Sequence, residues 1–394
     1  MFLRVVSGAI LLLGAMTTAQ AAVSKAPAVM SDETKECVAC HKKNNPGLVQ
    51  MWGASKHYGA NVGCYECHAA DAGDADAFIH DGKKVKKHIS IIVSPADCAN
   101  CHSVEEQEMT SSHHAEAGKI MGSLDNLLAE VVEGDMGMVT EGFPDGVSAA
   151  AVNGCWQCHG SKVVVLEDGS LDPATWPNTG IGRINPDGSK GTCAACHSRH
   201  QFSVAQARHP ENCTKCHMGP DHPQKEIYDE SKHGIAYVAN IDKMNMDNSK
   251  WIPGEDYYAA PTCSTCHMSA TRKQSVTHNV GDRISWTNRP PVSKKQGWIA
   301  GTVGWEDRRD KMKDVCQSCH EEGWVENWYV QYDGMVEMYN RKYGKPGLKL
   351  MKAAKPLIAL PKFSSKIDFV WFELWHHEGR RARMAASMMG PDIT

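Results

Sequence analysis

Eight copies of one pattern, Cys-x-x-Cys-His, constrain this chain more than any other feature of its sequence. The pattern uses all 16 cysteines, so no thiol is left over for another purpose. The pairs are Cys37/Cys40, Cys64/Cys67, Cys98/Cys101, Cys155/Cys158, Cys193/Cys196, Cys213/Cys216, Cys263/Cys266 and Cys316/Cys319, and the histidines that follow them are His41, His68, His102, His159, His197, His217, His267 and His320. Two thiols at this spacing can form thioethers with the vinyl groups of one haem, and the next histidine then lies under the iron. The sequence therefore predicts eight covalently attached c-type haems, each with a proximal ligand.

Two other uses of paired cysteines explain the pattern less well. A disulfide framework does not need a histidine after every pair. A structural zinc site combines one Cys-x-x-Cys with a second one or with a spaced histidine pair. Haems are large apolar bodies that loops and short helices can wrap, and strand patterns are few. We therefore expect a mainly α fold with extensive coil.

The remaining histidines are the candidates for the second axial position of each iron. Of 20 histidines, twelve lie outside the motifs: His57, His80, His88, His113, His114, His200, His209, His222, His233, His278, His376 and His377. A haem that only carries electrons usually has both axial positions filled, whereas a catalytic haem keeps one open. Twelve candidates allow either eight or seven distal ligands. We expect most of them to be ligands, and we select His57, His88, His113 (or its neighbour His114), His200, His233, His278 and His376.

The chain divides into a leader and three regions. Residues 1–21 read as a signal peptide, with Arg4, a short apolar run and a cleavage site after about Ala21, so we expect export to the periplasm. A retained N-terminal anchor is the alternative. Residues 22–145 form a three-haem region with one amphipathic helix near 120–131, and residues 146–322 form a five-haem catalytic region.

The C-terminal region, residues 323–394, is predicted to form long antiparallel helices. Apolar and aromatic side chains recur there at helical spacing: Val325, Trp328, Tyr329, Tyr332, Val336 and Tyr339. Such a stripe is more often a packing surface than a cofactor site. The helical pattern continues to Thr394, so we expect the natural protein to extend further. The net charge of −4 shows no nucleic-acid footprint.

Several long strings resemble the octahaem hydroxylamine oxidoreductases. They are "CWQCHGSK", "NTGIGRINPDGSKGTCAACHSRH", "ENCTKCHMGPDHPQKEIYDESKHG", "PTCSTCHMS" and "WHHEGRRARMAASMMGPD". The resemblance implies a mostly helical homotrimer in which the haem on Cys155 and Cys158 is the reaction centre and seven others are bis-histidine carriers. By likeness to related pentahaem nitrite reductases, it makes His222 the pocket histidine, Asp221 its neighbour and His233 a distal ligand.

One position sets the expected direction of the reaction. In family members that oxidise hydroxylamine, a tyrosine after "MMGPD" bonds covalently to the catalytic porphyrin of a neighbouring subunit. Ile393 stands at that position here and cannot form such a link. We therefore expect reduction of hydroxylamine or nitrite to ammonia, with a periplasmic or membrane-bound cytochrome as electron partner. Oxidation of hydroxylamine to nitric oxide or nitrite, and a non-catalytic electron conduit, are the alternatives.

Overall fold

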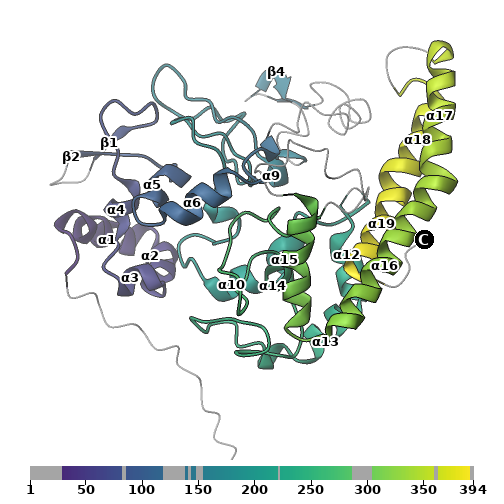
Figure 1. Cartoon of the computed structure of the whole chain (residues 1–394). Helices are drawn as coiled ribbons and strands as arrows, with labels where there is room; N and C mark the ends of the chain where they lie inside the picture. The colour runs from purple at the N-terminus through teal and green to yellow at the C-terminus, as the bar shows by residue number, and fades with distance from the viewer. Residues whose placement is uncertain are drawn as a thin grey trace, which may run out of the picture.

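The computed structural model describes residues 29–81, 86–118, 138–140, 143–147, 154–220, 222–285, 304–358 and 363–390. These residues form a coil-rich body of short helices, followed by long helices that run along one side of it (Figure 1). The prediction of a mainly α fold with long C-terminal helices is confirmed. The predicted signal peptide, the predicted helix near 120–131, Asp221 and Ile393 lie outside the described residues.

The body contains short helices and two small sheets. Its elements are α1 (Asp32–Asn44), α2 (Pro46–Gly53), α3 (Lys56–Gly59), α4 (Cys64–His68), β1 (Phe78–Asp81), β2 (Lys86–Ile89), α5 (Pro95–Ala99), α6 (Ser103–Thr110), β3 (Met138–Thr140), β4 (Phe143–Val147), α9 (Trp156–His159), η2 (Cys193–Ala195), α10 (Val204–Arg208), α11 (Pro210–Thr214), α12 (Gln224–Glu230), α13 (Lys232–Ala239), η3 (Ile241–Lys243), α14 (Cys263–His267) and α15 (Trp305–Gln317). The C-terminal elements are α16 (Glu322–Tyr339), η5 (Asn340–Gly344), α17 (Lys345–Ala354), η6 (Lys355–Leu357), α18 (Lys366–Phe372), η7 (Glu373–Glu378) and α19 (Gly379–Met388).

Side-chain caps allow the short helices of the body to form. Hydroxyl oxygens of Ser55, Ser203, Ser231 and Thr262 accept a backbone N–H from the first turn of α3, α10, α13 and α14, respectively. Such a cap satisfies one of the backbone donors that a helix start leaves unpaired. Because isolated helices this short are unstable, they depend on the tertiary structure, and this includes α14 with its Cys-x-x-Cys-His motif.

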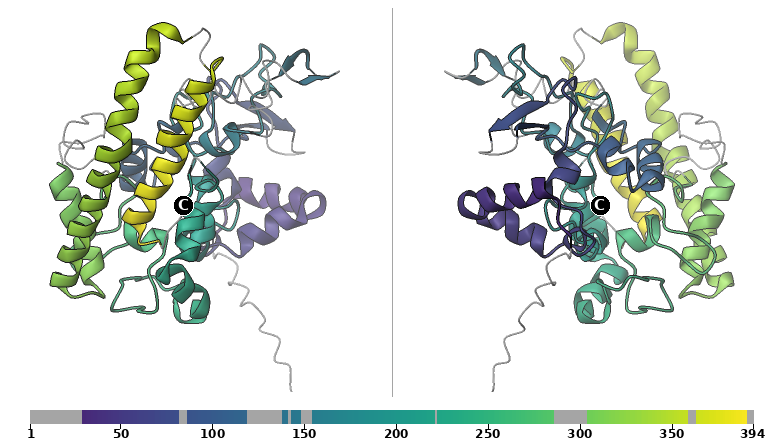
Figure 2. Two further views of the ribbon diagram at one scale, coloured as in Figure 1. Left: turned by 90° about the vertical axis from the view of Figure 1, so that its right-hand side faces the viewer. Right: turned by 90° about the vertical axis from the view of Figure 1, so that its left-hand side faces the viewer.

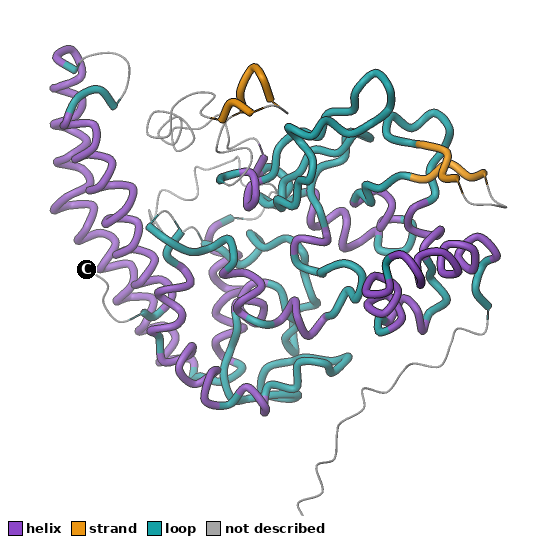
Figure 3. The backbone as a smooth tube through the Cα atoms, turned by 180° about the vertical axis from the view of Figure 1, so that it is seen from behind, coloured by secondary structure: helices purple, strands orange, loops and turns teal. Residues whose placement is uncertain are grey.

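The two sheets contribute little to the body. Strands β1 and β2 pair antiparallel with Phe78 opposite Ile89 and His80 opposite Lys87, and β3 pairs antiparallel with β4. Figure 3 shows both hairpins at the edge of the body, with loops filling most of the space between the helices. The β1–β2 hairpin carries His80, whose exposed ring lies 6.1 Å from that of His41.

The long C-terminal helices form an antiparallel hairpin against the body, as the side views in Figure 2 show. The predicted stripe of α16 is buried: Val325, Tyr329, Tyr332, Val336 and Tyr339 are each less than a tenth exposed. Helix α19 packs against both α16 and α12 and so connects the hairpin to the body. Among the residues that the structure describes, no helix is both long and apolar enough to cross a membrane.

Candidate haem centres

The Cys-x-x-Cys-His motifs form helical turns. In five motifs the histidine N–H donates to the carbonyl of the first cysteine: His102 to Cys98, His159 to Cys155, His197 to Cys193, His217 to Cys213 and His320 to Cys316, over 2.8–3.1 Å. Positions i, i+3 and i+4 of a helical turn share one face. Both sulfurs and the imidazole of a motif can therefore point toward the same side, as attachment to one haem requires.

All eight motifs contribute to the wall of one connected cavity of about 2820 Å³. Fifteen of the cysteines and all eight motif histidines line it, and most of the remaining lining atoms are apolar. Across the described residues, no group of three or more His, Cys, Asp or Glu side chains is placed to hold a single metal ion. Thiols beside an apolar cavity, with an imidazole next to each pair, match the needs of covalently bound haem and not those of zinc.

Cys40 is the one predicted haem-attachment cysteine that does not line the cavity. Its side chain is exposed, and its sulfur accepts a hydrogen bond from Nδ2 of Asn44 at 3.3 Å. The first motif lies inside the continuous helix α1, where Cys37 and His41 turn toward the cavity. At about 100° per residue, Cys40 lies about 100° around the helix from His41, on the flank of that face. Cys40 is thus the one motif cysteine whose side chain lies outside the cavity wall, and its attachment to haem stays a prediction.

Eight further histidines line the same cavity, which equals the number of motifs. They are His57, His80, His113, His114, His200, His222, His233 and His278. Six of them face a motif histidine with these ring-centroid separations: His41–His80 6.1 Å, His102–His57 6.2 Å, His68–His200 6.4 Å, His217–His114 6.1 Å, His320–His233 6.1 Å and His159–His222 5.9 Å.

These separations suit two imidazoles on one iron. With metal–nitrogen bonds of about 2.0–2.1 Å on either side, ring centres of two ligands lie roughly 6 Å apart. The two remaining motif histidines also have a cavity histidine nearby. Next to His197 is His278, which lowers the pKa of His197 electrostatically, although burial of His197 contributes more. His113 lies against Gly281, and His267 lies beside the adjacent Val280.

Two predicted distal ligands lie elsewhere. His88 on β2 and His376 on η7 are not on the cavity wall, and neither are His209 and His377. The buried His376 ring instead stacks on Phe372 at 4.3 Å. The structure brings His80 and His114 to the cavity instead. His80 is not among the predicted ligands, and His114 is named only as the alternative to His113. His57, His113, His200, His233 and His278 line the cavity as expected.

Close contacts between sulfurs of different motifs show the order of the motifs in space. Hydrogen-bonded thiol pairs join Cys37 to Cys64, Cys98 to Cys193, Cys158 to Cys216 and Cys213 to Cys263. Electrostatic neighbours extend the series from Cys67 to Cys98, from Cys196 to Cys213 and from Cys266 to Cys316.

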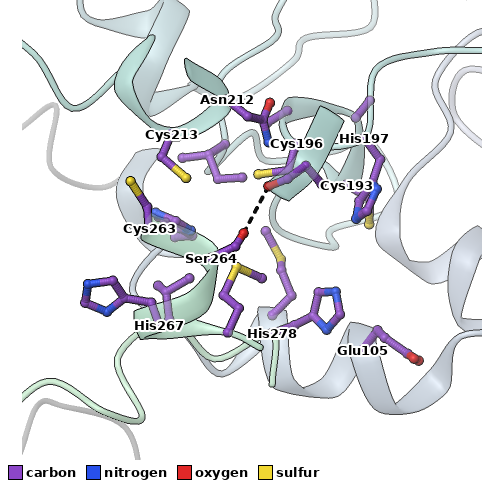
Figure 4. A pocket seen from close by; sticks show the side chains of 18 of the residues that line it. Glu105, Cys193, Cys196, His197, Asn212, Cys213, Cys263, Ser264, His267 and His278 are labelled. Atoms are coloured by element: carbon purple, nitrogen blue, oxygen red, sulfur yellow. Dashed lines mark hydrogen bonds between the residues drawn. The ribbon is translucent and has the colours of Figure 1, made fainter. Parts of the chain in front are cut away.

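The sulfur contacts place seven of the motifs in one continuous series, called the run below, and attach the fourth motif to the side of that series. Motifs one, two, three, five, six, seven and eight follow one another, and the third contacts the fifth directly through Cys98 and Cys193. The fourth motif joins at the sixth, through Cys158 and Cys216. Figure 4 shows part of the run, with the sulfurs of Cys213 and Cys263 pointing toward each other. Spatial order thus differs from order along the chain.

A glycine-rich segment holds the fourth motif in place. The backbone N–H groups of Ile181 and Gly182 donate to the carbonyls of Cys158 and His159 at 2.9 and 3.0 Å. A Cβ added at Gly180 would lie 2.0 Å from the nitrogen of Gly160. Only glycine permits so close an approach of two backbones. This explains the spacing of glycines in "NTGIG", directly beneath the candidate proximal ligand His159.

His222 occupies a special place in the cavity. Its ring centre lies 5.9 Å from that of His159 and 6.1 Å from that of His217, so it stands between the fourth and sixth motifs. His217 already faces His114. His222 is therefore the cavity histidine that faces His159, the histidine of the fourth motif. The Nδ1 atom of His159 is buried with no hydrogen-bond acceptor among the described residues, whereas Nδ1 of His68 lies 2.7 Å from the carbonyl of Ser90.

The buried imidazoles are neutral at physiological pH. Burial lowers the pKa of His114, His197 and His267 to about 4. Burial also lowers the pKa of His57, His113, His200 and His233. A neutral ring keeps a nitrogen lone pair available for a metal. Protonation states and geometry therefore agree with axial ligation.

Comparisons with known proteins point to the same class. Residues 183–342 match the family described as "Seven times multi-haem cytochrome CxxCH", and residues 11–69 match "Cytochrome c554 and c-prime". A probable nitrite reductase–hydroxylamine oxidoreductase fusion protein of Kuenenia stuttgartiensis is 27% identical over 353 residues. That alignment covers 78% of this chain but only 36% of the length of the fusion protein.

Solved structures show the same fold. A hypothetical multihaem protein superposes with a TM-score of 0.74 at 25% identity, covering 92% of this chain and 91% of its own. A chain of a reducing hydroxylamine-oxidoreductase-like complex of Kuenenia stuttgartiensis gives a TM-score of 0.53 at 22% identity, covering 91% of this chain and 70% of its own.

The motifs, the cavity and these matches define a multihaem cytochrome c with covalently attached haem. Within that class, the chain is similar to hydroxylamine-oxidoreductase-like proteins, as the matches to the fusion protein and to the reducing complex of Kuenenia stuttgartiensis indicate.

Proposed function

We propose that this chain reduces nitrite or hydroxylamine to ammonia at the haem attached to Cys155 and Cys158, supplied with electrons by seven further haems. The spatial order of the sulfurs carries the proposal. Electrons can pass from the third motif to the fifth through the Cys98–Cys193 contact without visiting the fourth. The fourth haem is thus not needed to carry electrons along the series. A haem in that position is suited to substrate chemistry, whereas a haem that only carries electrons is expected within the series.

The residues around this haem suit a reaction that consumes protons. The haem supplies a Lewis-acidic iron and electrons when it is bound. His159 would hold the iron as its proximal ligand, and the ring centre of His222 lies 5.9 Å from that of His159. In hydroxylamine reduction the N–O bond breaks, nitrogen leaves as ammonia and oxygen leaves as water, so protons must arrive with the electrons. We assign His222 as the group that delivers them, with Asp221 beside it in sequence.

Ile393 supports the reductive direction. An isoleucine cannot form the porphyrin link that a tyrosine makes in the oxidising members of the resembling family. In line with that resemblance, we propose a homotrimer located in the periplasm after cleavage near Ala21. Its electron partner would be a periplasmic or membrane-bound cytochrome.

One measurement of the structure favours a second function, that of a non-catalytic electron conduit. The ring-centroid separation of His159 and His222, 5.9 Å, is close to the 6.1–6.4 Å of the other facing histidine pairs. A His222 bound to the iron would close the fourth haem and leave eight closed carriers.

The spin state of the oxidised protein, measured with and without His222, separates the two functions. The proposed enzyme has one high-spin haem in wild type, and His222→Ala keeps that signal while slowing hydroxylamine reduction by about 10²–10⁴-fold. The conduit has only low-spin haems in wild type, and His222→Ala creates a high-spin signal. His88→Ala, which removes a histidine away from the cavity wall, is the matched control.

A further inference from the structure

Helix α6 places two carboxylates beside axial histidines of two different motifs. Oε2 of Glu108 accepts the backbone N–H of His278 at 2.7 Å and lies 3.8 Å from Nδ1 of the same residue. One turn earlier, Oε2 of Glu105 lies 4.0 Å from Nδ1 of His102. Glu108 is not on the cavity wall, so it stands behind the His278 ring and not between that ring and the haem.

The two histidines belong to neighbouring motifs of the run. His102 is the motif-three histidine and faces His57, and His278 adjoins the motif-five histidine His197. Figure 4 shows His278 and His197 on one side of Ser264, with Glu105 beyond them on α6. Since Cys98 and Cys193 are in contact, α6 lies along the step from the third motif to the fifth.

Among the described residues, no lysine or arginine lies within ion-pair distance of these two carboxylates. In the described part of the chain, the ion-pair partners of Glu105 and Glu108 are His102 and His278. The haem sites therefore experience a net negative charge from this helix.

Negative charge beside an axial ligand favours the oxidised iron, which carries one more positive charge than the reduced iron. This charge effect lowers the reduction potential of the haem. Solvent screens Glu108 less than Glu105, because their side chains are 32% and 48% exposed, respectively.

We infer that Glu108, assisted by Glu105, tunes the haem of motif five to a low potential and the haem of motif three to a lesser extent. These haems form the low-potential stretch of the run between its N-terminal end and the junction at motif six. The assignment rests on haem attachment and on His278 as an axial ligand. It does not rest on substrate or direction, so it stands for an enzyme and for a conduit alike.

A spectroelectrochemical titration of the haem-loaded full chain tests the assignment. Glu108→Gln removes the charge and keeps the size of the side chain. One component of the titration should move to higher potential by at least a tenfold change in its redox equilibrium, about 59 mV for a one-electron couple. Glu105→Gln should move a component in the same direction by less. Glu230→Gln, an exposed glutamate on α12 outside the cavity wall, is the control and should reproduce the wild-type curve.

A charge-conserving variant separates tuning from simple disturbance of the fold. Glu108→Asp keeps the negative charge while altering the hydrogen bond, so its titration should stay closer to wild type than that of Glu108→Gln. Equal shifts in the two variants, or a Glu108→Gln curve identical to that of Glu230→Gln, would overturn the assignment. Haem stain and mass of each variant establish that all haems are still attached.

Discussion

Replacing Gly180 by alanine should displace the fourth motif. The added Cβ would lie 2.0 Å from the nitrogen of Gly160, 2.4 Å from its Cα and 2.4 Å from the carbonyl oxygen of Trp156. All three atoms are backbone, so none can rotate away. Overpacked sites typically cost 1–3 kcal/mol, and we expect about 3 kcal/mol here. At about 2 °C per kcal/mol for a large domain, the melting temperature should fall by about 6 °C.

The same change should reach the iron ligand. Ile181 and Gly182 hold the carbonyls of Cys158 and His159, so a shift of this segment moves the proximal imidazole. The assays are thermal unfolding of the haem-loaded protein and electron paramagnetic resonance of its ferric haems. Gly73→Ala is the control, since nothing lies within 4 Å of the Cβ it would add. If Gly180→Ala has the same melting temperature as Gly73→Ala and leaves every haem signal unchanged, the role assigned to the glycine-rich segment is wrong.

Two further changes test the C-terminal hairpin and the ligand assignment. Gly334 is inside α16, with nothing within 4 Å of an added Cβ, so Gly334→Ala should raise the stability by about 0.8–1 kcal/mol, measured by thermal unfolding. His80→Ala should convert one low-spin haem to high-spin while all haems stay attached, because the His80 ring faces His41. His88→Ala, on the paired strand, should leave the spectrum unchanged, and the opposite result would restore His88 as the ligand.

Local patterns in the sequence predicted the local parts of this structure. The helical turn of each motif is encoded within five consecutive residues, so proximal ligands are readable from spacing alone. The stripe from Val325 to Tyr339 is likewise a property of a single helix, and its burial is confirmed. The fold class followed from the haem content, since apolar porphyrins replace much of an ordinary core.

Long-range contacts carried the rest, and no local pattern encodes them. His80 lies on β1 and His88 on β2 of the same hairpin, and only the strand register decides which side chain turns toward His41. The rotation of α1 against the cavity, which leaves Cys40 on the outside, is likewise set by packing and not by the motif. The role of Glu108 depends on its contact with His278, 170 positions away.

The direction of electron flow at the fourth haem tests the central claim most directly. The haem-loaded protein is poised half-reduced without oxygen, hydroxylamine is added, and haem absorption and ammonia are followed together. The account predicts that the haems become oxidised while ammonia forms. Haems that become more reduced would show a hydroxylamine oxidase despite Ile393, and haems that do not respond would show a conduit.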